Sequence, residues 1–192
     1  MPVFGTVALG KLYERLQGIN DDPSYYSDPR YMTSFPFPFD YGRLPAERFR
    51  FEDLEELRFM YMGRTNFAQL WKQFNLLKLR GAFTQIYIEG SMGHGKSHIL
   101  AVLAGLLSRL GKRTVYLPDC RNLLASQIRY MKTALLCAFA DPSSSEKRQR
   151  IRALNSQEDI ELFCGQQKPM YFIIDQMNAL DHEETNRDNV ND

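Results

Sequence analysis

The stretch Gly90-Ser91-Met92-Gly93-His94-Gly95-Lys96-Ser97 decides which fold we expect of this chain. It matches the Walker A pattern G-x-x-x-x-G-K-[ST], in which a glycine-rich loop cradles phosphate groups. The apolar run Phe83 to Ile88 comes directly before it, and the helical run Ser97 to Leu110 begins at its end. The sequence therefore predicts the order of strand, loop and helix that the motif needs.

The residue types of this loop predict a nucleotide site. Glycines let successive backbone N–H groups point toward one centre, and the positive end of the following helix adds to this seat for anionic oxygens. We expect Lys96 to reach the β- and γ-phosphates and the Ser97 hydroxyl to bind Mg²⁺. His94 and His98 belong to the predicted nucleotide-binding segment 90–98, where we expect them to serve geometry and surface rather than acid–base chemistry. The alternative is a glycine-rich turn that holds no ligand.

A second predicted part of the site is the acid that ends the apolar run Met170 to Ile174. A buried parallel strand has this composition, and open α/β sheets bind ligands at the carboxyl ends of their strands. We expect Asp175, at the Walker B position, to bind Mg²⁺ opposite Ser97. Gln176 follows, where many related ATPases carry a glutamate that takes a proton from the attacking water. An amide can orient water but cannot accept its proton, so we expect slow hydrolysis, with Glu89 and Asp181 as weaker candidates for the base.

Composition restricts the function classes. The chain has 192 residues, enough for one well-buried domain, and a formal charge of +1, which gives no overall attraction to nucleic acid or membrane. The longest apolar run, Ile99 to Leu107, is too short to span a bilayer. Cys120, Cys137 and Cys164 lack metal-ligand spacing. We expect reduced thiols, an intracellular location and no membrane partner.

The rest of the chain predicts an α/β domain with an N-terminal extension. We expect residues 1–43 to form a peripheral arm, extended through the proline-rich run Ser34 to Asp40, whose phenylalanines attach it to the domain. Residues 44–181 are predicted to be the P-loop domain, with its core at 83–181, and residues 182–192 a disordered acidic tail. The predicted fold class is an α/β three-layer sandwich of P-loop NTPase type, with a mainly parallel sheet that is shortened on its C-terminal side.

Local patterns predict the further elements of this domain. We expect a short helix within Phe51 to Met62. Helical spacing follows Thr65 as far as Gly81, a strand covers Thr114 to Leu117, and helices cover Asn122 to Phe139 and Gln157 to Cys164, the last capped by Ser156. Tyr61, Arg64 and Phe67 are candidates for an adenine wall, although core and surface roles are the stronger expectation. The basic run Lys147 to Arg152 is interpreted as a solvated helix face, with a phosphate or nucleic-acid contact as the alternative.

Three stretches carry a resemblance to a known family. The segments Tyr87 to Leu100, Lys112 to Arg121 and Tyr171 to Leu180 resemble the P-loop NTPase domain of Crinkler proteins, found in oomycetes and fungi. The resemblance covers residues 83–181. It implies that the pair Asp175–Gln176 is a family trait, and that the protein acts as an effector, secreted to the cytoplasm or nucleus of a host, with DNA as a partner. The chain departs from the family at both ends. We expect either a fragment or truncated gene product, or a sheet whose missing strand is supplied by the N-terminal region, by a protein partner or by an oligomer.

The leading hypothesis is a P-loop NTPase that binds ATP, or else GTP, with Mg²⁺, hydrolyses it slowly and acts as a switch or motor part of a Crinkler-like effector. A degenerate scaffold that binds protein or DNA without hydrolysis is the main alternative. A small-molecule or nucleoside kinase is the third, in which Lys147 to Arg152 would act as a basic lid.

Overall fold

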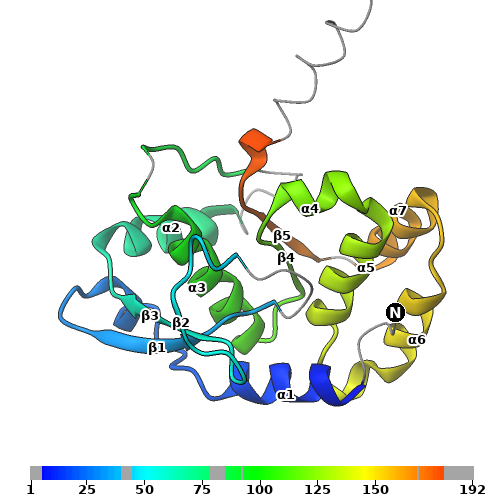
Figure 1. The fold of residues 1–192 in the computed structure, drawn as a ribbon, viewed down its shortest axis with the longest axis horizontal. Helices are drawn as coiled ribbons and strands as arrows, with labels where there is room; N and C mark the ends of the chain where they lie inside the picture. The colour runs from blue at the N-terminus through cyan, green and yellow to red at the C-terminus, as the bar shows by residue number, and fades with distance from the viewer. Residues whose placement is uncertain (1–5, 40–44, 78–84, 92, 168, 180–192) are drawn as a thin grey trace, which may run out of the picture.

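The computed structural model describes residues 6–39, 45–77, 85–91, 93–167 and 169–179 (Figure 1). Its strands are β1 (Met32–Pro36), β2 (Phe51–Asp53), β3 (Arg58–Met62), β4 (Thr114–Leu117) and β5 (Tyr171–Ile174). Its helices are α1 (Thr6–Gln17), α2 (Thr65–Leu77), α3 (Lys96–Arg109), α4 (Cys120–Ala125), α5 (Gln127–Ala138), α6 (Ser145–Ala153) and α7 (Gln157–Gln166). These elements make a mixed α/β protein, which confirms the α/β part of the predicted fold class.

The N-terminal strands form an antiparallel sheet in the order β1-β3-β2. The helix predicted within Phe51 to Met62 is wrong, because this segment is the β2–β3 hairpin. Buried residues alternate along it at Leu57, Phe59 and Tyr61, which is the period of a strand that has one face in the core. Met60 and Met62 lie on the opposite, exposed face. The acidic residues of this segment lie in the first strand and the turn.

The strands β4 and β5 form a separate parallel pair, with Thr114 opposite Tyr171 and Leu117 opposite Ile174. Both strands agree with the predicted ones. The chain connects them through residues 118–170, which contain helices α4 to α7. Because the strands are parallel, their carboxyl ends meet at one edge, where Pro118 and Asp175 follow them.

The strand predicted at Phe83 to Ile88 is not formed in its described part, residues 85–88, and Phe83 itself lies outside the described residues. Tyr87 is 69% exposed, and Ile86 is exposed too. A strand needs a neighbour for its backbone hydrogen bonds, and the only parallel sheet among the described residues consists of β4 and β5. In the described chain the sheets are therefore one antiparallel and one parallel, rather than one mainly parallel sheet.

The core is centred on α3, which is buried over most of its circumference from Ile99 to Leu107. Figure 1 shows α3 between the antiparallel sheet and the strands β4 and β5. Helix α1 packs against α3 and α5. The tight approach of β1 to α3 occurs at Gly105, where a Cβ atom would lie 2.7 Å from the ring of Phe35.

The predicted N-terminal arm is part of this core rather than peripheral. Leu9 and Leu12 of α1 and Phe35, Phe37 and Phe39 of the proline-rich run are all buried. The expectation that these phenylalanines attach the segment to the domain is confirmed. The predicted boundaries at residues 43/44 and 181/182, and the predicted tail at 182–192, lie outside the described residues.

The remaining helices follow their local patterns. Helix α2 buries Phe67, Leu70 and Phe74, while the predicted 122–139 helix is divided at Ser126 into α4 and α5. Helix α7 begins with a capping box, in which the Ser156 hydroxyl accepts from the Asp159 N–H and the Asp159 carboxylate accepts from the Ser156 N–H. Among the described residues, no helix combines the length and apolar character that crossing a bilayer requires.

Candidate functional site

The described residues of the motif predicted to bind phosphate form a loop that ends at the N-terminus of α3. Gly90, Gly93 and Gly95 all have φ in the positive range, at 146°, 83° and 70°, where residues with a Cβ are strained. Gly95 is the N-cap of α3 and has no side chain to accept hydrogen bonds from the first turn. A Cβ at Gly90 or Gly93 would meet no atom within 4 Å, so the space beside them is open. Met92 lies outside the described residues.

Lys96 closes this loop on itself. Its Nζ donates to the carbonyl oxygens of Gly90, at 2.5 Å, and Ser91, at 2.8 Å. The Ser91 hydroxyl lies 2.8 Å from Nδ1 of His94. Carbonyl oxygens are weaker partners for an ammonium group than phosphate oxygens, because they carry only partial charge. The Lys96 ammonium group, which is predicted to bind phosphate, therefore lies at the loop. Its bonds to the two carbonyl oxygens could be replaced by bonds to phosphate oxygens.

Arg64 supports the loop from the end of β3. Its Nη1 donates to the His94 carbonyl oxygen at 2.9 Å, and its guanidinium lies 2.6 Å from where a Cβ of Gly95 would be. The sequence suggested Arg64 as part of an adenine wall, whereas the structure places it against the loop backbone. Tyr61 and Phe67 are buried in the core. The positive φ of Gly95 favours glycine at this position, and a side chain there would also have to displace the Arg64 guanidinium.

The fold brings Ser97 and Asp175 together, as the predicted metal site requires. The Ser97 hydroxyl lies beside the Asp175 carboxylate, whose Oδ1 accepts from the Gln176 N–H at 2.9 Å. Asp175 is 7% exposed. Burial raises the pKa of Asp175, and the hydrogen bond from Ser97 and the charge of Arg48 oppose that rise.

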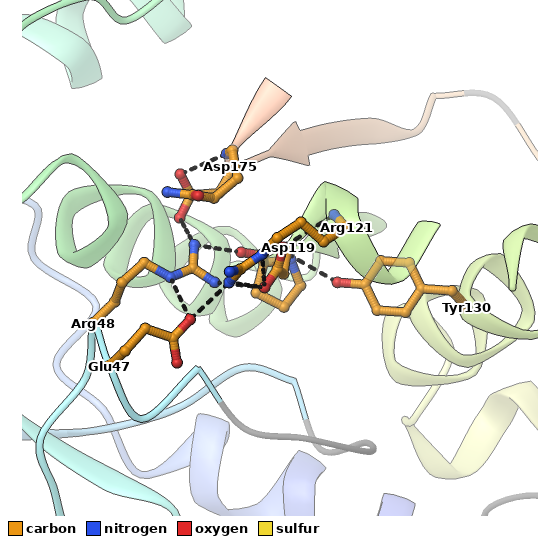
Figure 2. Close-up of polar contacts among 8 residues, drawn as sticks. Glu47, Arg48, Asp119, Arg121, Tyr130 and Asp175 are labelled. Carbon is orange, nitrogen blue, oxygen red and sulfur yellow. Dashed lines mark hydrogen bonds and ion pairs between the residues drawn. The ribbon is translucent and has the colours of Figure 1, made fainter. Parts of the chain in front are cut away.

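Two further residues complete this carboxyl edge (Figure 2), and the sequence reasoning missed both. Arg48 Nη1 lies 3.2 Å from Asp175 Oδ2 and donates to the Pro118 carbonyl oxygen at 2.9 Å. Its Nη2 lies 3.3 Å from Oδ2 of Asp119, the residue just beyond β4. Asp119 had a detectable signal, since it follows a predicted strand and Pro118, as Asp175 follows its own strand. Arg48 had none.

Asp119 is held from several sides. Its carboxylate accepts from the Arg121 backbone N–H at 3.0 Å as the N-cap of α4, and it pairs with the Arg121 guanidinium. Its own N–H donates to the Tyr130 hydroxyl at 3.0 Å, and Arg121 also pairs with Glu47 at 2.7 Å. Burial acts to raise the pKa of Asp119, but these hydrogen bonds and charges outweigh it and leave the pKa lowered. Asp119 is therefore an ionised structural anchor.

Gln176 has an unusual backbone conformation. Its φ is 64°, in the left-handed region that residues with a side chain seldom adopt. Strain of this kind is concentrated at sites where the surrounding structure fixes the chain. In its strained conformation, the Gln176 backbone N–H donates to the Asp175 carboxylate, and this hydrogen bond helps to orient the carboxylate.

His98 lies one turn into α3 and packs on aromatic rings. Its ring centroid is 4.7 Å from that of Phe49 and 5.4 Å from that of Phe59. Burial lowers the pKa of His98, and the nearby Arg64 lowers it further. These contacts place His98 between the loop helix and the antiparallel sheet, in a packing role.

The basic run in α6 is engaged in local contacts. Arg148 is buried and donates to the carbonyl oxygens of Phe139 and Asp141. The Lys147 Nζ lies 5.4 Å from the centre of the Phe139 ring, and Arg150 donates to Gln166. The run therefore does not present one row of exposed charges.

The oxygen donors fit Mg²⁺ in the presence of a nucleotide. Mg²⁺ in phosphate sites is usually bound by one or two protein oxygens together with water and the phosphates. Ser97 and Asp175 supply such a pair, and no group of three His, Cys, Asp or Glu side chains elsewhere in the described chain makes a metal cluster. Comparison with protein-family models, with curated proteins and with solved structures found no match.

Proposed function

We propose that this protein binds a Mg²⁺ nucleotide, ATP or else GTP, at the loop 90–98, in the manner of a P-loop NTPase. The observation that carries the proposal is that Ser97, at the start of α3, lies beside Asp175, at the end of β5, close enough to lower the pKa of its carboxyl group. The motif predicts this pair from the sequence, and two distant segments must meet to form it. A glycine-rich turn without a ligand would not require an acid at this place.

The residues of the site have separate roles in this proposal. The loop N–H groups and the N-terminus of α3 bind phosphate oxygens, and Lys96 leaves the Gly90 and Ser91 carbonyls for the β- and γ-phosphates. Ser97 and Asp175 hold the metal, which supplies charge neutralisation of the phosphates. Arg64 fixes the loop backbone through the His94 carbonyl.

Hydrolysis in this site is slow, because Gln176 can orient a water molecule but cannot take its proton. The steady-state phosphate release of Gln176→Glu tests this point. General-base assistance contributes roughly 10²–10⁴ in rate, so we expect a gain of at least about tenfold. An unchanged rate would show that position 176 does not limit the reaction.

Nucleotide binding is tested by thermal unfolding of the full chain with and without Mg²⁺-ATP and Mg²⁺-GTP. At a nucleotide concentration about 100 times Kd, binding stabilises the folded state by about 2.7 kcal/mol. For a chain of this size, that corresponds to a rise in Tm of about 5 °C or more. Lys96→Ala is expected to abolish the rise.

The matched control is Lys112→Ala, because Lys112 follows the far end of α3, about 20 Å from the loop by helix length. This variant is expected to keep the nucleotide-dependent rise. If the wild-type protein gains no stability at millimolar nucleotide, or if Lys96→Ala gains as much as wild type, the proposed function is wrong.

The biological setting that we propose is a switch or motor part of a Crinkler-like effector, supported by the three sequence stretches in and beside this site. In that setting the protein acts inside a host cell, in cytoplasm or nucleus, with protein or DNA as its partner. The P-loop sandwich is proposed as well, with residues 83–88 joining the sheet beside a strand from a partner or a further copy.

A second candidate function is a scaffold that binds protein or DNA without turnover. Two observations favour it: Gln176 stands where a base would be, and residues 85–88 form no strand. Nucleotide-dependent stabilisation without phosphate release would support a scaffold that retains nucleotide. Nucleoside kinase activity, the third alternative, receives less support, because Arg148 of the supposed lid is buried.

A further inference from the structure

Arg48 lies across the edge where β4 and β5 end, although it belongs to the segment before β2. Its guanidinium contacts Asp175 Oδ2 at 3.2 Å, Asp119 Oδ2 at 3.3 Å and the Pro118 carbonyl oxygen at 2.9 Å. Figure 2 shows the guanidinium between the two carboxylates. The Arg48 side chain is 14% exposed, and those of Asp175 and Asp119 are 8% and 9% exposed. An arginine fork buried in this way is a fixed part of the edge rather than a surface ion pair.

The two carboxylates depend on Arg48 to different degrees. Asp119 has a second cation, Arg121, at 2.6 Å. Asp175 accepts from the neutral Gln176 N–H and lies beside the neutral Ser97 hydroxyl, and within the described part of the chain Arg48 is the charged group that pairs with it. The negative charge of Asp175 is therefore balanced by Arg48.

A metal ion at Ser97 and Asp175 would use the same carboxylate. Two cations on one carboxylate repel each other, and the repulsion is strong where water is excluded. A nucleotide brings phosphate oxygens to this edge, and the planar fork of an arginine matches them well. The arriving metal nucleotide thus supplies both a competitor for Asp175 and a new partner for Arg48.

We propose that Arg48 is a resident cation that competes with Mg²⁺ for Asp175, and that it moves from Asp175 to a phosphate oxygen when the metal nucleotide binds. This inference rests on the proposed function. It makes Arg48 a positioning residue for the metal ligand in the free protein and a phosphate-binding residue in the complex. It also links the nucleotide to the antiparallel sheet, because the next residue, Phe49, packs in the core against Phe37 and Phe59.

The test is direct binding of Mn²⁺, followed by its paramagnetic resonance signal, to the full chain without nucleotide. Arg48→Gln leaves Asp175 without its cation, so we expect Mn²⁺ to bind about tenfold more tightly than to wild type. Damage to the structure would weaken metal binding, so a gain in affinity distinguishes competition from a purely structural role. In the presence of Mg²⁺, the same variant is expected to bind a non-hydrolysable ATP analogue about tenfold more weakly, because a charged hydrogen bond to phosphate is lost.

Arg121→Gln is the matched control, since Arg121 belongs to the same cluster but pairs with Asp119 and Glu47. It is expected to leave Mn²⁺ affinity unchanged. Arg48→Lys keeps a charge but cannot bridge three acceptors, and it serves if Arg48→Gln does not fold; its Mn²⁺ affinity is expected to rise about threefold. Unchanged or weaker Mn²⁺ binding in a folded Arg48 variant, beside normal nucleotide binding by wild type, would overturn this inference alone. If the wild-type protein binds no nucleotide, the proposed function is wrong as well.

Discussion

The substitution Gly105→Ala tests whether strand β1 of the N-terminal sheet packs on helix α3. An added Cβ would lie 2.7 Å from both Cε1 and Cζ of the buried Phe35 ring and 3.4 Å from Cδ2 of Leu16. An aromatic ring in a packed core cannot move aside without displacing its own neighbours, so overpacking costs about 1–3 kcal/mol. Replacing glycine by alanine within a helix raises the free energy of unfolding by about 1 kcal/mol, because alanine has the higher helix propensity. We therefore expect a net loss of about 1 kcal/mol in the free energy of unfolding.

Gly10→Ala in α1 is the matched control, because a Cβ there would meet nothing within 4 Å. This variant should gain up to about 1 kcal/mol from the same helix preference. Both variants share the helix preference of alanine over glycine, so it cancels when their changes in the free energy of unfolding are subtracted. The remaining difference is the cost of the contact with Phe35, about 1–3 kcal/mol. Urea unfolding measures both free energies, and equal m-values confirm that the unfolded state is unchanged. If Gly105→Ala is stabilised as much as Gly10→Ala, β1 does not lie against α3 and the packing described here is wrong.

Three further predictions concern single contacts. Gln176→Gly removes the strain of a positive φ and is expected to raise the free energy of unfolding by about 1 kcal/mol, as measured by urea titration; a loss would show that the side chain stabilises this turn. Burial acts to raise the pKa of Asp141, but hydrogen bonds from groups that include the Arg113 guanidinium outweigh burial and hold the pKa at about 2. Because the pKa in the unfolded chain is about 3.9, ionised Asp141 stabilises the fold above that pH. This stabilisation is lost as the pH falls through about 2. Asp141→Asn should therefore lower the Tm at pH 7 and leave it nearly unchanged at pH 2, and an equal loss at both pH values would exclude this linkage. Ser156→Ala removes the hydroxyl that accepts from the Asp159 N–H and is expected to cost about 1 kcal/mol in chemical unfolding, whereas Ser156→Asn should retain most of the stability.

The parts of the fold that follow from local pattern were predictable. The helix after the loop, the strands β4 and β5 and the Ser156 cap each depend on residues that lie within a few positions of one another. The β2–β3 hairpin was missed because carboxylates with apolar residues between them suggested a short helix, although the alternation of Leu57, Phe59 and Tyr61 was present. The strand expected at Phe83 to Ile88 failed in its described part because a strand depends on neighbours as well as on its own apolar residues.

The candidate site divides in the same way. Lys96 and Ser97 could be predicted because they occupy fixed positions of the motif. Asp175 could be predicted because it is the acid that ends an apolar strand. Arg48 could not, since it lies 127 positions from Asp175 and no pattern connects the two. Long-range ion pairs of this kind are decided by how elements pack, which a single sequence does not display.

We expect the long connection between β4 and β5 to delay the formation of the candidate site. Ser97 and Asp119 are close to each other along the chain. Asp175 reaches them only when β5 pairs with β4, which requires closure of the long connection 118–170. Pairings between distant residues form slowly compared with helices. During refolding, the helical circular dichroism signal is therefore expected to return before the proposed nucleotide binding does. A chain arrested before these strands pair would have the loop 90–97 without Asp175, the proposed metal ligand, beside it.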